Sequence, residues 1–307
     1  MAKATVAGGN TSFRSQSTSD KAFDVVNTLI MVLLVFVFAW PLLFVLSASV
    51  SDPNAVWTGQ VILLPKGLNI NGYIEILKYK DIWVGYRNTL FYTIVGTAVN
   101  LVMTVCAAYP LSRPDFMLRR PLTLVFMFTM YFSGGLIPTY LIVQKLGLIN
   151  SPWAIIIPSA VSIYNVIITR TYFENSIPDS LREASELDGA NSLQFLIRIV
   201  LPLSGPILAV MGLYYGVGRW NSYFDALIYL NNKEMYPLQM FLRDILIQNK
   251  MQLDLPGLDP VQAVAKKQLG EIMKYAMIVV ATVPVLCVYP FIQKHFVKGV
   301  MIGAIKG

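Results

Sequence analysis

Histidine and cysteine are scarce in this sequence, whose 307 residues include one histidine, His295, and two cysteines, Cys106 and Cys287. Both cysteines lie inside apolar runs, so the sequence predicts neither a disulfide framework nor a thiolate metal site. The patterns G-x-x-x-x-G-K-[ST], H-E-x-x-H, C-x-x-C and G-x-S-x-G are also absent. We therefore expect no catalytic site, cofactor site or metal site in this chain, and no enzymatic activity of its own.

Charged residues are few as well. They make up 13% of the chain against 55% hydrophobic residues, and the mean hydropathy is +0.58. A net charge of +7 would suit a soluble nucleic-acid-binding protein, but the basic residues flank apolar segments and form no stripe, which argues against nucleic acid. Because the apolar residues come in long runs, the sequence indicates an integral membrane protein in contact with lipid.

The long apolar runs predict an all-α membrane protein with six transmembrane helices. Each run is close to or above the roughly 20 residues that cross the hydrocarbon core. The first is too long for the apolar region of a cleaved signal peptide. We expect a flexible tail over 1–22, a six-helix domain over 23–296 and a C-terminal tail over 297–307. The predicted spans are 23–50, 86–111, 121–143, 153–172, 203–230 and 273–292.

Charges in the short loops predict the orientation. Arg113, Arg119 and Arg120 lie in one short loop, whereas Lys145 is the one basic residue in the opposite short loop. The positive-inside rule then places both termini in the cytoplasm. The long segments 51–85 and 231–272 would lie outside. In the second of these, the spacing of apolar residues predicts a short amphipathic helix and a following loop, marked by Leu238, Phe241, Ile245 and Leu246 and then by Pro256, Gly257 and Pro260.

The segment 177–202 is a polar island between apolar runs. Pro178 with Asp179 or Ser180 is expected to begin a helix, and Ser180 and Glu183 have the spacing of a capping box. Gly189 is expected to end that helix with a left-handed residue.

A second short helix is expected after the glycine, capped by Asn191 or Ser192 and leading to Pro202. The first helix carries mixed charge around an apolar side, and such a surface suits another protein better than it suits lipid. The segment is therefore predicted to be a docking element.

The same segment carries a family motif. It reads Glu183-Ala184-Ser185, then Gly189 after three residues, Ile199 after nine more, and Leu201-Pro202 after one more. This resembles the EAA loop of ATP-binding-cassette (ABC) importer permeases, with Ser185 in place of the family's second alanine. The resemblance implies a type I importer permease fold whose cytoplasmic EAA loop, 177–202, contains a coupling helix. It also implies an ATPase-coupling role for Glu183, Ala184, Ser185, Glu186, Asp188, Gly189, Leu201 and Pro202.

The fifth predicted span holds polar residues among aromatic ones. Ionisable residues at membrane depth commonly face a polar cavity, so Arg219, Asn221 and Asp225 indicate a path for a substrate. Trp220 is expected to share a helical face with Tyr223 and Phe224 and to offer rings on which a sugar can stack. An interfacial aromatic belt explains the same residues equally well.

Tyr140 in the third span invites a similar interpretation. It follows Gly134, Gly135 and Pro138, residues that are common at contacts between membrane helices, and helix packing is the favoured explanation there. The candidate substrate-path residues are therefore Trp220, Asn221, Tyr223, Phe224, Arg219 and Tyr140.

The C-terminal sequence F-V-K-G-V-M-I-G-A-I-K-G resembles the ending of maltose-type sugar-importer permeases. Within that group the chain is most similar to the LplC/YtcP-like permeases, which are associated with complex or acidic oligosaccharides. The resemblance implies an ATP-driven carbohydrate importer in the plasma membrane. Its implied partners are a second permease, two cytoplasmic ATPase subunits that bind ATP and Mg, and an extracellular solute-binding protein.

The expected mechanism is alternating access, with motion of the loop reaching the attached spans through Tyr172 and Pro202. A secondary transporter driven by an ion gradient is the alternative, supported by Arg219 and Asp225 but lacking an evident inverted repeat. A membrane enzyme ranks third, because no catalytic constellation is present.

Overall fold

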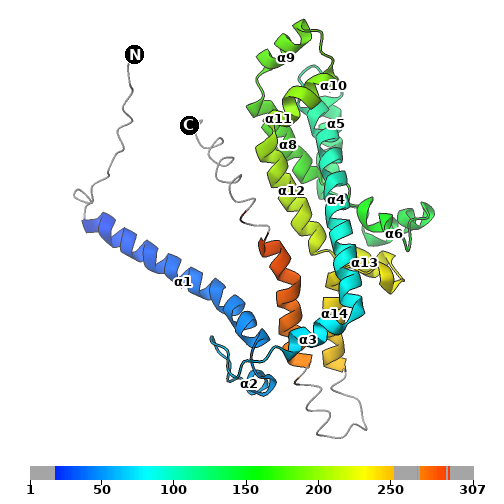
Figure 1. The fold of residues 1–307 in the computed structure, drawn as a ribbon. Helices are drawn as coiled ribbons and strands as arrows, with labels where there is room; N and C mark the ends of the chain where they lie inside the picture. Colours follow the sequence, from blue (N-terminus) through cyan, green and yellow to red (C-terminus); the bar gives the residue numbers. More distant parts are fainter. Residues whose placement is uncertain (1–17, 252–267, 269, 288–289, 291–307) are drawn as a thin grey trace.

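The computed structural model describes residues 18–251, 268, 270–287 and 290, and these residues form helices and connections without a strand (Figure 1). The prediction of an all-α chain is therefore confirmed for this part. The first half contains α1 (Thr18–Ser49), α2 (Pro53–Trp57), α3 (Asn71–Lys78), α4 (Lys80–Ser112), α5 (Arg119–Tyr131) and α6 (Leu136–Lys145). The second half contains α7 (Trp153–Ile156), α8 (Ile163–Ser176), α9 (Asp179–Leu187), α10 (Ser192–Phe195), η1 (Leu196–Val200), α11 (Leu201–Leu203), α12 (Gly205–Trp220), α13 (Phe224–Tyr229), η2 (Lys233–Met235), α14 (Leu238–Met251) and a helix over Gly270–Cys287, called the 270–287 helix below.

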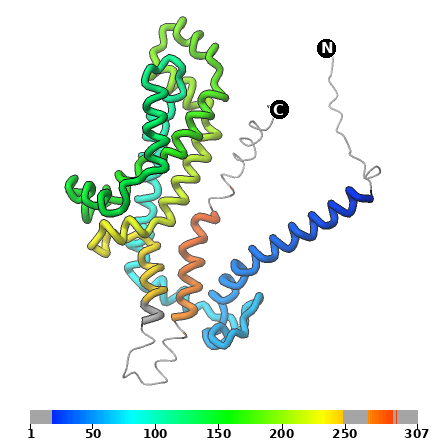
Figure 2. The backbone as a smooth tube through the Cα atoms, turned by 180° about the vertical axis from the view of Figure 1, so that it is seen from behind, coloured from blue at the N-terminus to red at the C-terminus, as the bar shows by residue number. Residues whose placement is uncertain are grey.

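Helix α1 projects away from the other helices (Figures 1 and 2). Its buried residues are Ser47, Ala48 and Ser49, all at its C-terminal end. It begins at Thr18, so residues 18–22, predicted to belong to a flexible tail, are helical. Its exposed side chains are mostly apolar, which suits contact with lipid or another apolar surface better than contact with water.

Helix α4 is the centre of the larger bundle and makes its most extensive contacts with α12 and α8 (Figure 1). Lipid tails are as apolar as these helices, so close packing rather than exclusion of water holds membrane-embedded contacts of this kind together. The buried side chains at this centre are Val105, Ala108, Tyr109 and Leu111 of α4, Val166 and Phe173 of α8, and Ile207, Met211 and Tyr215 of α12.

A second group of buried residues joins the 270–287 helix to the part of the chain around α3 and α14. Met277 and Ala281 of this helix pack with Ile76, Leu238 and Phe241. The predicted amphipathic helix is thus present as α14, and Leu238, Phe241 and Ile245 of this helix belong to the group. The loop predicted around Pro256, Gly257 and Pro260 lies outside the described residues, as do positions 1–17 and the predicted tail over 297–307.

The third predicted span, 121–143, is not a straight helix. It is divided into α5 and α6, whose axes differ by 115°. The break falls over 132–135, where Gly135 has a φ of 88°. A residue with a side chain avoids that left-handed region, whereas glycine enters it without a steric penalty. Gly134 and Gly135 therefore mark a break rather than a helix-packing surface.

The fourth and fifth predicted spans are also interrupted. Segment 153–172 is divided into α7 and α8, and Pro158 between them has no N–H with which to continue a helical hydrogen-bond ladder. Segment 203–230 is divided into α12 and α13 at Asn221–Tyr223. Each of these two predicted spans is therefore an interrupted helix in the structure.

The described residues contain three helices that are long and apolar enough to cross a membrane: α1, α4 and the 270–287 helix. Two bent pairs raise the number to five if each pair is one span, namely α5 with α6, and the 192–203 helical segment with α12. The chain is therefore a multi-pass membrane protein with several interrupted helices. The bend of 81° between the 192–203 segment and α12 lies directly after the EAA motif.

Candidate functional site

The first candidate site is the helix–turn–helix over 177–204, which contains the predicted EAA loop, 177–202, and is called the coupling loop below after the role predicted for it. Figure 1 shows α9 and α10 at one end of the bundle. Helix α9 begins directly after Pro178, whose extended backbone precedes the first helical residue. Ser180 already lies inside α9, and no side chain caps this helix. The predicted capping box between Ser180 and Glu183 was therefore wrong, because proline occupies the capping position.

The turn between the two helices has the predicted left-handed glycine. Gly189 has a φ of 80°, and its N–H donates to the carbonyl of Glu186 at 3.0 Å. The next N–H, of Ala190, donates to the carbonyl of Ser185 at 2.9 Å. These two bonds satisfy carbonyls that the end of α9 would otherwise leave free. Gly189 thus sets the angle at which the chain enters α10.

Asn191 caps α10 in a reciprocal capping box. Its side-chain oxygen accepts from the N–H of Gln194 at 2.9 Å, and the Gln194 side chain accepts from the N–H of Asn191 at 2.9 Å. The helix continues through one π turn, η1, into α11, which contains Leu201 and Pro202. The predicted second helix is confirmed, with Asn191 as its cap.

The residues of the EAA motif divide between an outer and an inner surface. Glu183, Glu186 and Asp188 are exposed, whereas Ser185 is buried and donates to the carbonyl of Arg182 at 2.8 Å. Leu187 is 90% exposed, next to this row of carboxylates. Exposed leucine beside exposed carboxylates forms the kind of mixed surface that another protein can cover.

The C-terminal end of α4 holds the inner surface of the coupling loop. The Tyr109 hydroxyl donates to the carbonyl of Ser192 at 3.2 Å. The Arg113 guanidinium lies 5.0 Å from the centre of the Tyr109 ring and 5.5 Å from that of Phe195. The coupling loop is thus attached to α4 by side chains, as well as to α8 and α12 by the backbone.

An ion pair adds a further link from the segment after α4 to α9. Nη1 of Arg182 lies 3.0 Å from a carboxylate oxygen of Asp115. From the sequence, Arg113 is predicted only to be a loop charge, and no role is predicted for Tyr109 or Asp115. Polar residues at the end of a long span indicate that this end contacts polar groups. The sequence does not show that those groups belong to residues 182–195.

The second candidate site surrounds Arg219, which is 7% exposed. Its Nε and Nη2 donate to the side-chain oxygen of Asn100 in α4 at 3.0 and 2.9 Å. It also donates to three backbone carbonyls and one hydroxyl near the end of α7: Ile155 O at 2.6 Å, Ile156 O at 3.1 Å, Ser159 O at 2.9 Å and Ser159 Oγ at 2.8 Å. We call Arg219, Asn100 and segment 155–160 the Arg219 junction.

The junction explains how an interrupted helix is tolerated here. A helix that ends at Ile156 leaves carbonyl groups without intrahelical donors, and the guanidinium supplies those donors. The Asn100 amide supplies two more, to the carbonyls of Ser159 at 2.7 Å and Ala160 at 2.8 Å. Hydrogen bonds therefore hold the Arg219 guanidinium in this junction, and a role of Arg219 in a substrate path stays a prediction.

A cavity of about 200 Å³ lies beside the junction. Its walls combine hydroxyl groups, aromatic rings and the carboxylate of Asp225. Rings that stand next to hydroxyl groups can meet both the polar and the apolar faces of a sugar. The lining residues are Asn100, Ser159, Tyr214, Tyr215, Gly218, Arg219, Ser222 and Asp225.

The aromatic residues predicted for the path do not share one face. Helix α12 ends at Trp220, whose side chain is buried and donates its Nε1–H to the carbonyl of Ala281 at 2.8 Å. Tyr223 and Phe224 follow the break and are exposed, with ring centres 6.4 Å apart. The prediction of a common helical face was wrong because the helix ends between these residues.

The remaining predicted path residues lie in different surroundings. Asn221 is exposed, and its side chain donates to the carbonyl of Val217 at 2.9 Å. Tyr140 stacks on Tyr229 of α13, with ring centres 6.2 Å apart, and packs in a different group of buried residues from Trp220. The structure therefore gathers Arg219, Ser222 and Asp225 at one cavity and leaves Tyr140 and Trp220 elsewhere.

Known proteins resemble this chain over nearly its whole length. The family model described as the binding-protein-dependent transport system inner membrane component matches residues 4–302. The polygalacturonan/rhamnogalacturonan transport system permease protein YtcP of Bacillus subtilis is 39% identical over 289 residues, which cover 94% of this chain and 99% of that relative. Protein LplC of the same organism is 37% identical over 287 residues, with 94% and 96% covered.

A solved structure agrees with these relatives. The crystal structure of a bacterial ABC transporter involved in the import of the acidic polysaccharide alginate contains a chain with 35% identity and a TM-score of 0.82. The match covers 92% of this chain and 99% of that one. The type I ABC importer permease fold is thus present. The chain belongs to the family of binding-protein-dependent transport system inner membrane components, the permease subunits of ABC importers.

Proposed function

We propose that this chain is a permease subunit of an ATP-driven importer of acidic oligosaccharides in the plasma membrane, with both termini in the cytoplasm. Its proposed partners are a second permease chain, two ATPase subunits that bind ATP and Mg, and an extracellular solute-binding protein. The observation that carries the proposal is the coupling loop: a capped helix–turn–helix with carboxylates and Leu187 outward and a buried inner surface attached to α4.

The coupling loop is proposed to transmit the motion of the ATPase pair. Glu183, Glu186 and Asp188 lie on its outer surface, where an ATPase would bind, and Gly189 sets the angle between its helices. Motion of the loop would reach α8 and α12 through the backbone at Tyr172 and Pro202. It would also reach α4 through Tyr109, Arg113 and Asp115, the side-chain links that connect that helix to the loop. Shared motion of three packed helices is a means of alternating access.

The names of the relatives support the proposed substrate class. YtcP is named for polygalacturonan and rhamnogalacturonan, and the solved transporter imports alginate, an acidic polysaccharide. Because Arg219 is fully engaged in its junction, we place recognition of the acid group on the partner permease or the binding protein. In this chain the proposed path passes the cavity that Ser222 and Asp225 line. It also passes three exposed residues outside that cavity, Asn221, Tyr223 and Phe224. Trp220 would contribute only after a movement that exposes it.

Transport by the whole complex in proteoliposomes tests the proposal. Oligogalacturonide uptake should require the binding protein outside and ATP with Mg inside, and it should persist when ion gradients are collapsed. A neutral oligosaccharide of equal length should be taken up more slowly. Uptake that follows an ion gradient and ignores ATP would instead support the secondary transporter, which no relative described above favours.

Labelling of single cysteines tests the topology. Asp188 in the coupling loop and Lys233 in η2 are both exposed, and the proposal places them on opposite sides of the membrane. In a background with Cys106→Ala and Cys287→Ala, Lys233→Cys should react with a membrane-impermeant maleimide in intact cells. Asp188→Cys should react only after the cells are permeabilised. The reverse pattern would invert the orientation and remove the docking role of the loop.

A further inference from the structure

A cavity of about 710 Å³ lies beside the first turns of α5. It belongs neither to the coupling loop nor to the Arg219 junction, and three arginines from two segments of the chain line it. A cavity of that size can hold a charged group larger than a single ion. Its lining residues are Pro114, Phe116, Met117, Arg119, Arg120, Thr123, Leu124 and Arg170.

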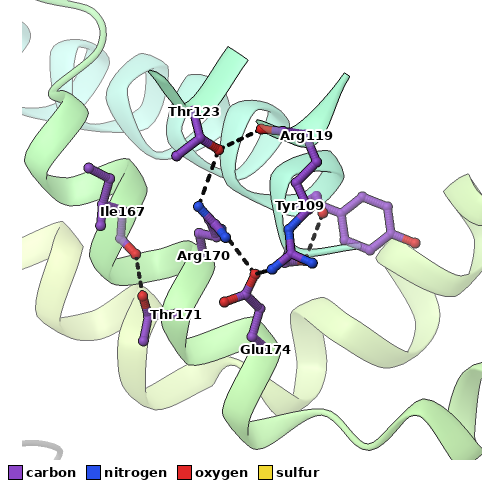
Figure 3. A network of polar contacts seen from close by, with 8 residues as sticks. Tyr109, Arg119, Thr123, Ile167, Arg170, Thr171 and Glu174 are labelled. Carbon is purple, nitrogen blue, oxygen red and sulfur yellow. Dashed lines mark hydrogen bonds and ion pairs between the residues drawn. The ribbon is translucent and has the colours of Figure 1, made fainter. Parts of the chain in front are cut away.

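Two of the arginines are held in place by a shared carboxylate (Figure 3). Arg119 and Arg170 both donate to the same oxygen of Glu174, and the Arg170 Nε bond measures 3.0 Å. A second Arg170 nitrogen, Nη1, donates to the hydroxyl of Thr123 at 3.2 Å. These bonds connect the start of α5 to the second half of α8. One carboxylate between two guanidinium groups leaves the pair with net positive charge.

Arg120 increases that charge. Arg120 is exposed, and its side chain has no hydrogen-bond or ion-pair partner in the part of the chain that the structure describes. Three arginines and one glutamate give an excess of two positive charges (3 − 1 = 2). Guanidinium groups match the oxygens of a phosphate well, because they can donate two parallel hydrogen bonds.

The surface around the cavity is apolar, and this selects among anions. Met117 is 87% exposed at its rim, and Leu124, Val125 and Phe128 are exposed along α5. Helix α5 has no buried residue, so it lies at the edge of the bundle. A soluble phosphate would use only the arginines. A phospholipid would use the arginines for its headgroup and the strip of apolar side chains for its acyl chains.

We propose that this cavity binds the headgroup of an anionic phospholipid, with the acyl chains along Leu124, Val125 and Phe128. A bound lipid would also support the segment that precedes α5. Pro114 and Phe116 line the cavity, and Asp115 between them pairs with Arg182 of the coupling loop. The lipid site does not depend on which substrate the chain transports.

The test is lipid retention by the intact transporter. The complex is placed in nanodiscs with phosphatidylglycerol and phosphatidylcholine in equal amounts, and the lipids that remain after mild detergent extraction are counted by native mass spectrometry. Phosphatidylglycerol should be enriched in the wild type. Arg120→Gln should lower its apparent affinity about five-fold. Arg198→Gln, which removes an exposed arginine from η1, should leave retention unchanged.

Two further measurements separate the possible ligands. Leu124→Gln should reduce phosphatidylglycerol retention without any change in charge, and millimolar inorganic phosphate should fail to displace the lipid. Displacement by phosphate, with no effect of Leu124→Gln, would identify a site for a soluble anion and overturn the lipid assignment. Equal retention in wild type, Arg120→Gln and Arg198→Gln would show that the cavity holds no specific lipid.

Discussion

The coupling loop and the Arg219 junction use polar groups in opposite ways. In the loop, charges face outward, and the ordering hydrogen bonds join residues three to five positions apart, such as Gly189 with Glu186 and Asn191 with Gln194. At the junction, a charge is buried, and its bonds join residues 60 to 119 positions apart. The first arrangement joins residues that are close together in the chain, whereas the second exists only when three separate helices meet.

The difference predicts that the loop governs coupling and the junction governs stability. Changes at the junction should reduce the amount of folded protein before they affect mechanism. Changes on the loop should leave a folded permease that uses ATP less efficiently. The predictions below are arranged from the largest expected effect on stability to the smallest.

Replacing Arg219 by leucine should have the largest effect. Several carbonyls near α7 and the Asn100 oxygen would lose donors inside a buried site, and each unsatisfied buried group costs about 1–3 kcal/mol. We expect the midpoint of thermal unfolding of the detergent-purified complex to fall by at least several degrees. Arg198→Leu is the matched control, because Arg198 is exposed. Equal midpoints for the two variants would mean that the junction is not a stabilising element.

Gly189→Val should have a smaller effect on stability and a larger one on coupling. Its φ of 80° costs a residue with a side chain about 1–2 kcal/mol, although no neighbouring atom lies within 4 Å of an added Cβ. We expect lower uptake per ATP hydrolysed. Gly189→Asn should recover most of the wild-type ratio, since asparagine tolerates this backbone region. A wild-type ratio in Gly189→Val would show that the turn geometry does not matter for coupling.

The ion pair between Arg182 and Asp115 should contribute little to stability, because the Asp115 side chain is 62% exposed. An exposed pair is typically worth below about 1 kcal/mol. We expect Asp115→Arg to reduce uptake per ATP, because it places like charges between α9 and the segment after α4. Asp115→Arg combined with Arg182→Asp should restore part of it. If uptake per ATP hydrolysed is the same in the single and the double variant, the Asp115–Arg182 pair has no part in coupling.

Glu183→Ala should change stability least, since Glu183 is exposed in α9 and no ion pair involves it within the described residues. If Glu183 contacts the ATPase, uptake per ATP hydrolysed should fall while the permease remains folded and inserted. Asp81→Ala is the comparison variant, because Asp81 of α4 is also exposed and no ion pair involves it within the described residues. If uptake per ATP hydrolysed is the same in both variants, the Glu183 carboxylate is only solvated and does not contact the ATPase.

The interrupted helices show where prediction from sequence failed. Hydropathy correctly located α1, α4 and the 270–287 helix, because a long apolar run constrains its own length and environment. Hydropathy treats 121–143, 153–172 and 203–230 alike, although each contains a break. Gly135 and Pro158 were visible signals at two of these breaks, but the break at Asn221 has no comparable residue. Arg219 suggested a path, yet its donors are used by the carbonyls that the break after α7 leaves free.

By itself, the sequence determined the helical membrane class, the position and geometry of the glycine turn in the coupling loop, and the membership of the family that the motif indicates. These depend on composition and on contacts between residues close together in the chain. Only the tertiary structure decided that Tyr109 and Arg113 support the coupling loop, that Asn100 and Arg219 join three helices, and that Trp220 is buried. The reason is physical: a buried polar group must find a partner, and which partner it finds depends on helices that approach one another only in the folded bundle.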